Sequence, residues 1–447
     1  MEEGLFGVVL DPKFKSNGFL YLMYAPPTPS VYRISRWTLA GSSLGAEKVL
    51  LDIPAQREDC CHTGGGMAFD AYGDLWVAVG NNTGRRGNPV SMDETRQYNS
   101  DEWGASSTAG LRGGILRIHP DNSAKGYSIP AGNFGDYFAK RAQAAGDAAL
   151  AAQYRDSSKV LPEIYVKGTR NAYTLSLDPV RRWVMWGDVG PDNAGVRSEE
   201  NNLAKVPGFY GWPYFTGANL PYVGNKDAAA PTNTSKWNKG LATLPPAIPA
   251  INSYTKACAI TGSLYRYDGD LKSTVKLPPH FTRKWFATDW AKSKLVVFSL
   301  DDNANSITRI DTIALPSGSL SGPTDLKIGP DGALYVINYA GLFESGPNTG
   351  ISRIEYTGTC RPDVPKLETP EAIAPRARSL SGGMAALLVD PALERVVRLP
   401  RAAAGFRLFD LEGRQVWEQA GMRGGDSARL PKLSGGLALL RWIPAFP

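Results

Sequence analysis

The chain has 447 residues, 43% of them hydrophobic and 21% charged, which is the balance of a folded globular protein. This composition excludes a disordered, collagen-like or coiled-coil protein. Lys and Arg number 49 against 43 Asp and Glu, a net charge of +6, and the segment from Arg361 onward holds 13 of the basic and 9 of the acidic residues. Most of the excess charge therefore lies in the tail and does not indicate a nucleic-acid partner. No apolar stretch approaches the roughly 20 residues that a membrane-spanning helix needs.

One pattern repeats from residue 5 to residue 356: a strand, a turn built on Asp with Pro or Gly, and a second strand. Five such units are recognisable, at 7–24, 66–79, 174–186, 262–310 and 325–337. Sheets repeated around a ring predict an all-β fold, a β-propeller. Long loops interrupt the units, and the insertion at 127–158 carries the only stretch expected to be helical, residues 139–153.

The composition changes at residue 361. Residues 1–360 are assigned to the propeller, and the Pro- and charge-rich residues 361–378 to a linker. Residues 379–447 are predicted to form a small β-sandwich, with a hairpin at 406–417.

The four cysteines are Cys60, Cys61, Cys258 and Cys360. None stands in a Cys-x-x-Cys pair, so a structural zinc site is not expected. A disulfide between the adjacent Cys60 and Cys61, or bridges from them to distant parts of the chain, are both open.

Two segments are candidates for ligand binding from their residue types. His62 lies in the Gly-rich stretch Cys60–Gly66 before a strand, where a histidine can act as a general base or can simply bond a turn. Arg170 and Asn171 also stand before a strand, and their donors suit an anionic or polyhydroxylated ligand, or a surface ion pair.

A third segment offers hard oxygen atoms of the kind that Ca²⁺ prefers. It comprises Gly187–Asp192 and the following Ser198–Asn202, with Asp192 as a candidate metal ligand. An Asp-rich turn without a metal is the alternative interpretation.

Taken in order, several strings resemble the soluble quinoprotein glucose/sorbosone dehydrogenase family. They are residues 3–12, 62–65, 111–119, 168–171, 187–191, 208–213 and 329–335. The resemblance covers about residues 3–356 and implies a six-bladed propeller, whose missing strands are expected upstream of Met1. It also implies two cofactors, pyrroloquinoline quinone (PQQ) and a Ca²⁺ ion that polarises the quinone. The paired cysteines before the histidine look like those of a secreted bacterial branch.

The resemblance implies roles for single residues. His62 matches the base that removes the sugar hydroxyl proton, and Arg170 with Asn171 matches the pair that contacts cofactor and substrate. Lys292 or Lys294 stands near the position of a cofactor-binding lysine.

The calcium ligands implied by the resemblance are the backbone carbonyls of Gly190 and Pro191. Three positions depart from the family pattern. Gly322 and Thr324 stand where the family has an Arg pair against the quinone, and Glu2 replaces a Gln that contacts the cofactor.

The function expected from these observations is a PQQ-dependent dehydrogenase that oxidises the C1 hydroxyl of an aldose or oligosaccharide to a lactone and passes the electrons to an external acceptor. A non-redox glycan-binding propeller is one alternative. A Ca²⁺-dependent lactonase using Asp192, Glu199 and Glu200 is another.

The tail resembles the sorting domains of type IX secretion cargo through Asp410–Val416 and its Leu- and Gly-rich ending. A carbohydrate-interacting or merely stabilising sandwich is the alternative. No signal-peptide pattern is visible at Met1–Leu5, yet the cysteines agree with a secreted or cell-surface location.

Overall fold

The computed structural model describes residues 3–83, 95–97, 100–178, 181–191, 198–224, 226–255, 257–315, 318–339 and 348–358, and the backbone of six strands between residues 386 and 444. The chain forms two compact units, Met1–Pro365 and Lys366–Pro447. In the described residues, no helix is long and apolar enough to cross a membrane.

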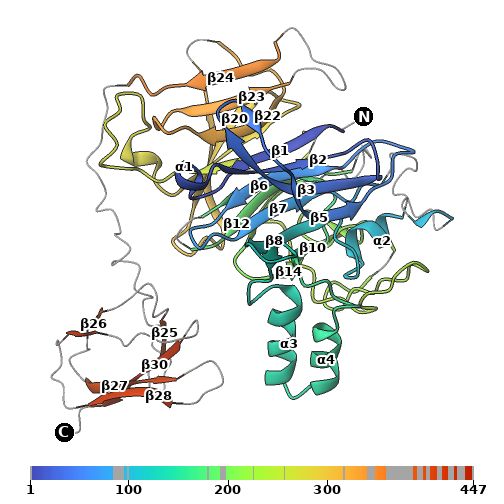
Figure 1. Cartoon of the computed structure of the whole chain (residues 1–447), viewed down its shortest axis with the longest axis vertical. Coiled ribbons are helices and arrows are strands. Elements are labelled where there is room, and N and C mark those ends of the chain that lie inside the picture. Colours follow the sequence, from blue (N-terminus) through green and yellow to red (C-terminus); the bar gives the residue numbers. More distant parts are fainter. Residues whose placement is uncertain are drawn as a thin grey trace. The chain divides into compact units, whose positions relative to one another are not determined.

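The first unit contains five main β-sheets in chain order (Figure 1). The first comprises β1 (Leu5–Leu10), β2 (Phe19–Tyr24), β3 (Val31–Ala40), β4 (Ser43–Leu44) and β5 (Lys48–Pro54). The second comprises β6 (Gly64–Phe69), β7 (Leu75–Val79), β8 (Gly114–Pro120), β9 (Tyr127–Ser128), β10 (Ile164–Lys167) and β14 (Gly208–Phe209). The third comprises β11 (Ala172–Leu177), β12 (Val184–Asp188), β13 (Glu199–Ala204) and β17 (Asn252–Tyr254).

The fourth sheet comprises β18 (Ala259–Leu264), β19 (Lys284–Asp289), β20 (Lys294–Leu300) and β21 (Ile307–Ile313). The fifth comprises β22 (Pro323–Ile328), β23 (Leu334–Asn338) and β24 (Gly350–Ile354). A separate short hairpin pairs β15 (Phe215–Thr216) with β16 (Leu220–Pro221). All these pairings are antiparallel except that of β10 with β14.

The Asp-containing turns form for a local reason that β6 and β7 illustrate. Asp70 ends the first strand, and its Oδ1 accepts hydrogen bonds from the backbone N–H groups of Tyr72 and Asp74. The side chain thereby replaces a backbone partner inside the turn. Its Oδ2 accepts the indole N–H of Trp76 in the second strand, so the turn and the strand are joined.

The first strands of the five sheets pack side by side in the order β1, β6, β11, β18 and β22. Three fully buried tryptophans, Trp76, Trp186 and Trp285, lie in the second strands of three consecutive sheets and fill the space between neighbours. This is the five-blade β-propeller arrangement that the repeat predicted. A sixth blade is not among the described residues.

The helices differ from the prediction. The stretch expected as one helix is two, α3 (Phe134–Ala144) and α4 (Ala148–Arg155), seen as a pair in Figure 1. The break falls where Gly146 has a left-handed backbone (φ 83°) and Asp147 caps α4 by accepting the N–H of Leu150. The described residues also contain three short helices that were not predicted: α1 (Phe14–Asn17), α2 (Asp101–Ser106) and the 3₁₀ helix η2 (Pro279–Phe281).

The second unit contains two antiparallel sheets. One has the order β25 (Ala386–Val389), β30 (Ala438–Pro444), β27 (Ala403–Phe409) and β28 (Gln415–Ala420), and the other pairs β26 (Val396–Arg398) with β29 (Ser427–Arg429). β27 and β28 are the two strands of the expected hairpin. The linker assigned to 361–378 lies outside the described residues, and the sandwich stays a prediction.

Candidate active site

His62, Arg170 and Asn171 stand at the same edge of their sheets because each lies just before a first strand. His62 precedes β6, and Arg170 and Asn171 directly precede β11. In an antiparallel hairpin, the start of the first strand lies beside the end of the second, and Ala172 indeed pairs with Asp188. The segment that follows β12 therefore emerges at the edge where the segments before β6 and β11 enter.

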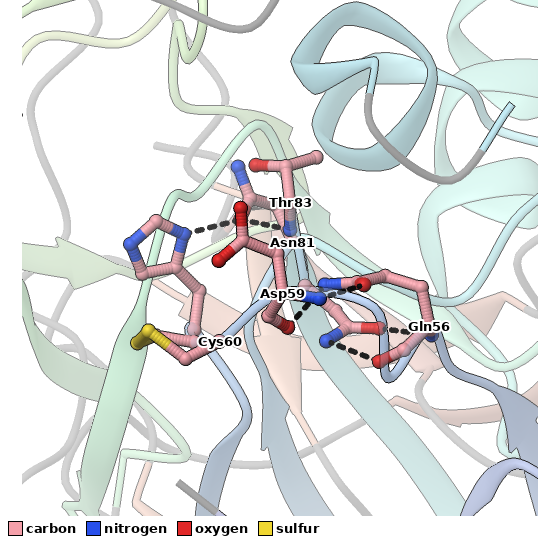
Figure 2. The surroundings of a disulfide bond; sticks show 8 residues. Gln56, Asp59, Cys60, Asn81 and Thr83 are labelled. Carbon is pink, nitrogen blue, oxygen red and sulfur yellow. Dashed lines mark hydrogen bonds between the residues drawn. A yellow bond between two sulfur atoms is a disulfide. The ribbon is translucent and has the colours of Figure 1, made fainter. Parts of the chain in front are cut away.

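A disulfide between Cys60 and Cys61 precedes His62 directly, which decides between the two pairings left open by the sequence. Figure 2 shows the disulfide with the loop that leads to it. The side chain of Gln56 closes this loop by accepting the N–H of Asp59 and donating to its carbonyl oxygen. The backbone N–H of Gln56 donates to Asn82 Oδ1 at 2.7 Å, so the loop is anchored to the segment after β7. Cys360 lies outside the described residues.

The imidazole of His62 is buried and held from two directions. His62 is 6% exposed and has a left-handed backbone (φ 62°), which is uncommon for a residue other than Gly. Its carbonyl oxygen accepts the N–H of Asn82 at 3.0 Å, and its Nδ1 lies 3.0 Å from Asn81 Oδ1. Gly80 is required here, because a Cβ at this position would lie 2.0 Å from the His62 oxygen.

Asp188 holds the backbone of Arg170 and Asn171. Its Oδ2 accepts the Arg170 N–H at 2.9 Å and its Oδ1 accepts the Asn171 N–H at 2.6 Å. The Arg170 guanidinium donates through Nη1 to the carbonyl oxygen of Val189 and lies over the ring of Trp212, with Cζ 5.7 Å from the ring centroid. A buried, oriented cation thus stands at this edge.

Two hydrogen bonds join the His62 segment to the Arg170 segment. Asn171 Oδ1 accepts the N–H of Gly64 at 3.3 Å, and the Arg170 carbonyl oxygen accepts the N–H of Asn81 at 2.8 Å. The structure therefore brings together three of the predicted residues, His62, Arg170 and Asn171.

Three buried carboxyl groups lie on β12 and β13, and one of them contacts Gly190. Glu199 Oε2 accepts the N–H groups of Gly190 and Ala259. Burial raises the pKa of Glu199 to about 7. Across the β12–β13 pair, burial also raises the pKa of Asp188 to about 6 and that of Glu200 to about 8. Several oxygen atoms and a surplus of buried acids are the chemistry that a divalent cation would complete.

The predicted calcium ligands are placed in part. Gly190 and Pro191 follow β12 and are buried, at the same edge as Arg170. Asp192 lies outside the described residues. No group of three or more His, Cys, Asp or Glu side chains within the described residues is arranged to hold a metal. The expected site instead relies on backbone carbonyls.

Lys292 lies in the turn between β19 and β20, Lys294 begins β20, and both line a cavity of about 210 Å³. Tyr254, Asp289 and Phe298 are among its other lining residues, and neither His62 nor Arg170 is. Lys292 Nζ donates to the Thr255 carbonyl oxygen and lies 3.9 Å from Asp289 Oδ2. As far as the described residues go, the two lysines thus border a different space from the His62 segment.

The two positions that depart from the family's Arg pair supply no cation. Gly322 has a left-handed backbone (φ 56°), and a Cβ there would lie 2.4 Å from the Tyr339 oxygen and 2.8 Å from the Trp290 indole nitrogen. No larger side chain fits this backbone. The hydroxyl of Thr324 donates a hydrogen bond to the carbonyl oxygen of Ile337. Glu2 lies outside the described residues.

Three residues of the site were missed by sequence reasoning: Asn81, Asp101 and Trp212. Asp101 Oδ1 accepts the side-chain N–H of Asn81 and the indole N–H of Trp212. Asn81 comes just after β7, at the edge where His62 enters, so its position was open to prediction. Asp101 begins α2 and Trp212 lies in the loop after β14, and no sequence spacing relates either residue to His62.

The sequence profile of the family described as glucose/sorbosone dehydrogenase matches residues 1–133 and 138–341. An uncharacterized protein from Synechocystis sp. is 25% identical over 339 residues, which cover 75% of this chain and 68% of that protein. Among solved structures, a Thermus thermophilus protein assigned as an oxidoreductase (glucose dehydrogenase) is similar with a TM-score of 0.53 and 20% identity, covering 79% of this chain and 83% of that one. The PQQ-bound aldose sugar dehydrogenase from Streptomyces coelicolor has a TM-score of 0.50 and 18% identity, covering 79% of each chain. The chain belongs to the glucose/sorbosone dehydrogenase family.

Proposed function

We propose that the protein is a PQQ-dependent sugar dehydrogenase that oxidises the C1 hydroxyl of an aldose or oligosaccharide to a lactone. The observation that carries the proposal is a buried histidine, oriented through Nδ1, that shares one edge of the propeller with a buried Arg–Asn pair. Family membership and the fold shared with the PQQ-bound Streptomyces coelicolor enzyme support it.

The residues before β11 and after β12 fit the two expected groups, whereas the positions of the family's Arg pair offer PQQ no charge. PQQ is a tri-acid, and the Arg170 guanidinium, held by Val189 and Trp212, would supply the positive charge to pair with such an anion. The carbonyl groups of Gly190 and Pro191 would hold Ca²⁺, whose charge the buried Glu199 and Glu200 would offset. When bound, the quinone supplies the two-electron acceptor, with Ca²⁺ polarising it.

His62 is the proposed base. With Nδ1 directed at Asn81, proton acceptance falls to Nε2. Removing the hydroxyl proton there would leave electron density on the C1 oxygen, and this would make C1 a better hydride donor to a bound two-electron acceptor. The sugar thereby loses one proton and one hydride, which balances its conversion to a lactone.

The test is a titration of the purified full-length protein with PQQ, with and without Ca²⁺, followed by dye reduction with a panel of aldoses. His62→Ala should bind PQQ but lose at least about 100-fold in turnover. His280→Ala is the matched control, because this histidine is exposed and bonded to Lys284. Unchanged turnover in His62→Ala would refute the assignment of the base.

A glycan-binding propeller without redox activity is the second candidate. The absence of a cation at Gly322 and Thr324 favours it, because two charges that would neutralise a tri-acid cofactor are missing there. Isothermal titration separates the two functions. Sugar binding in a protein that does not bind PQQ in Ca²⁺ would favour the glycan-binding function.

We also propose a secreted or cell-surface location. The Cys60–Cys61 disulfide supports it, since disulfides persist mainly in oxidising compartments. The sorting-type tail motif at Asp410–Val416 agrees with this location. Fractionation of cells that produce the protein naturally, with an antibody raised against it, tests this location, and recovery in the cytoplasm alone would contradict it.

A further inference from the structure

We infer that Asp101, acting through Asn81, determines which ring nitrogen of His62 accepts the proton. Asp101 is then a positioning residue for the proposed base, and the inference rests on the proposed function for its catalytic meaning. The tautomer itself is a property of the resting protein and can be measured without cofactor or sugar.

Asp101 is a convergence point for hydrogen-bond donors. It is 5% exposed and begins α2. Its Oδ1 accepts from Asn81 Nδ2, from the Thr83 hydroxyl at 2.6 Å and from the Trp212 indole N–H at 3.3 Å. Three donors directed at one oxygen are the pattern expected around an ionised carboxylate, which can only accept.

The orientation of the Asn81 amide follows from its neighbours. An Asn side chain has an oxygen end and an NH₂ end that a flip exchanges, and the surrounding hydrogen bonds decide between them. The Asp101 carboxylate needs the NH₂ end, and the backbone N–H of Thr83, 3.2 Å from Asn81 Oδ1, needs the oxygen end. Neither partner can change its role, so both require the same orientation.

This orientation places an oxygen opposite His62. Asn81 Oδ1 lies 3.0 Å from His62 Nδ1 and has no proton to give, so Nδ1 must carry the hydrogen. A neutral imidazole with Nδ1–H has its lone pair on Nε2. Figure 2 shows Asn81 and Thr83 beside the imidazole, with the dashed line joining Asn81 to the ring. A flipped amide would present NH₂ to Nδ1, move the hydrogen to Nε2 and disable the base.

Asp101 also contacts the second arm of the site. The indole that donates to Asp101 is the one over which the Arg170 guanidinium lies, 5.7 Å from the ring centroid. A single buried carboxylate therefore connects the histidine that would take the proton with the aromatic ring beneath the arginine.

The experiment uses ¹⁵N-histidine labelling of the full-length chain and two-bond ¹H–¹⁵N correlation spectra, which distinguish the two tautomers. The chain has only three histidines, so His119→Gln and His280→Gln assign the His62 signals. Above the titration range of its ring, wild-type His62 should be the Nδ1–H tautomer. An Nε2–H tautomer in the wild type would overturn the inference.

Asp101→Asn is the informative variant, because the amide it introduces can donate as well as accept and no longer forces the orientation of Asn81. We expect the Nε2–H tautomer to appear, and kcat for sugar to fall about 10- to 100-fold with KM changed less than about twofold. Glu102→Gln is the matched control. Glu102 is the next residue and equally buried, but its carboxylate accepts from Tyr214 and Thr234. An unchanged tautomer and kcat in Asp101→Asn, or the same change in Glu102→Gln, would refute the inference.

The double variant Asn81→Asp with Asp101→Asn exchanges the two groups. A carboxylate at position 81 again accepts from His62 Nδ1 and from the Thr83 N–H, and the amide at position 101 can donate to it. We expect this variant to restore the Nδ1–H tautomer, and failure to restore it would count against the inference. If Asp101→Asn does not fold, the wild-type and double-variant spectra decide. A wild type with the expected tautomer but no dehydrogenase activity would refute the proposed function and leave the tautomer assignment standing.

Discussion

Replacing Asp188 by Asn tests whether one buried carboxylate holds the Arg170–Asn171 backbone. Asp188 is 4% exposed, and its two oxygens each accept one backbone N–H, at 2.9 Å from Arg170 and 2.6 Å from Asn171. Asn is isosteric but has one oxygen and one NH₂ group. One of the two backbone N–H groups would then face a donor.

The expected loss in the free energy of unfolding follows from these two hydrogen bonds. A hydrogen bond to a charged group contributes about 1.5–3 kcal/mol, and a buried donor left without a partner costs about 1–3 kcal/mol. The substitution also removes a buried charge, whose unfavourable burial raises the pKa of Asp188, and this offsets part of the loss. We expect the free energy of unfolding to fall by about 2–4 kcal/mol.

The assay is guanidinium unfolding followed by tryptophan fluorescence, with hydrogen exchange of the Arg170 and Asn171 amides as the local readout. Asp302→Asn is the matched control, because the Asp302 side chain is 95% exposed, and it should change stability by less than about 0.5 kcal/mol. If Asp188→Asn unfolds like Asp302→Asn and both amides exchange as in the wild type, the reasoning is wrong.

Three further predictions concern the same region. Burial raises the pKa of Glu199 to about 7 from an ordinary value near 4.5, so its contribution to stability is complete at pH values below 4.5 and is lost as the pH rises through 7. Thermal unfolding should show a loss of stability of about 2.5 kcal/mol from this group between pH 5 and pH 8.5, and a smaller loss in Glu199→Gln or with Ca²⁺. A rise in stability over this range would contradict the prediction. Replacing both Cys60 and Cys61 by Ser should lower the free energy of unfolding by only about 1 kcal/mol, because the closed loop is so short. It should nevertheless lower kcat at least about fivefold, because His62 is held less firmly. Equal kcat in the variant and the wild type would show that the disulfide does not hold the base. Arg170→Lys keeps the charge but loses the planar donor to Val189 and the contact with Trp212, so the Kd for PQQ should rise about tenfold. The exposed Arg309→Lys is the control, and an unaltered Kd in Arg170→Lys would contradict the prediction.

Much of the fold could be predicted because the interactions that cause it are local in the sequence. The Asp70 turn depends on backbone groups two and four residues away, and the buried Trp76, Trp186 and Trp285 recur in the second strand of successive repeats. The break at Gly146 has an equally local cause, because a Gly followed by a capping Asp ends one helix and begins the next. The prediction of a single helix gave too much weight to the Ala-rich composition of this stretch.

The candidate site likewise has a part that local sequence predicts and a part that depends on packing. The repeat pattern alone placed His62 and Arg170 just before strands and Gly190 just after one, because strand starts and ends can be located from the hairpin spacing. Which side chains meet at this edge follows from the three-dimensional packing of the sheets and loops. Asp101, at the start of α2, accepts from Asn81 and from Trp212, which lie far apart in the chain, and Lys292 borders a cavity that His62 and Arg170 do not line. The physical reason is that hydrogen bonds between loops depend on how the blades pack, and packing joins residues that no spacing in the sequence relates.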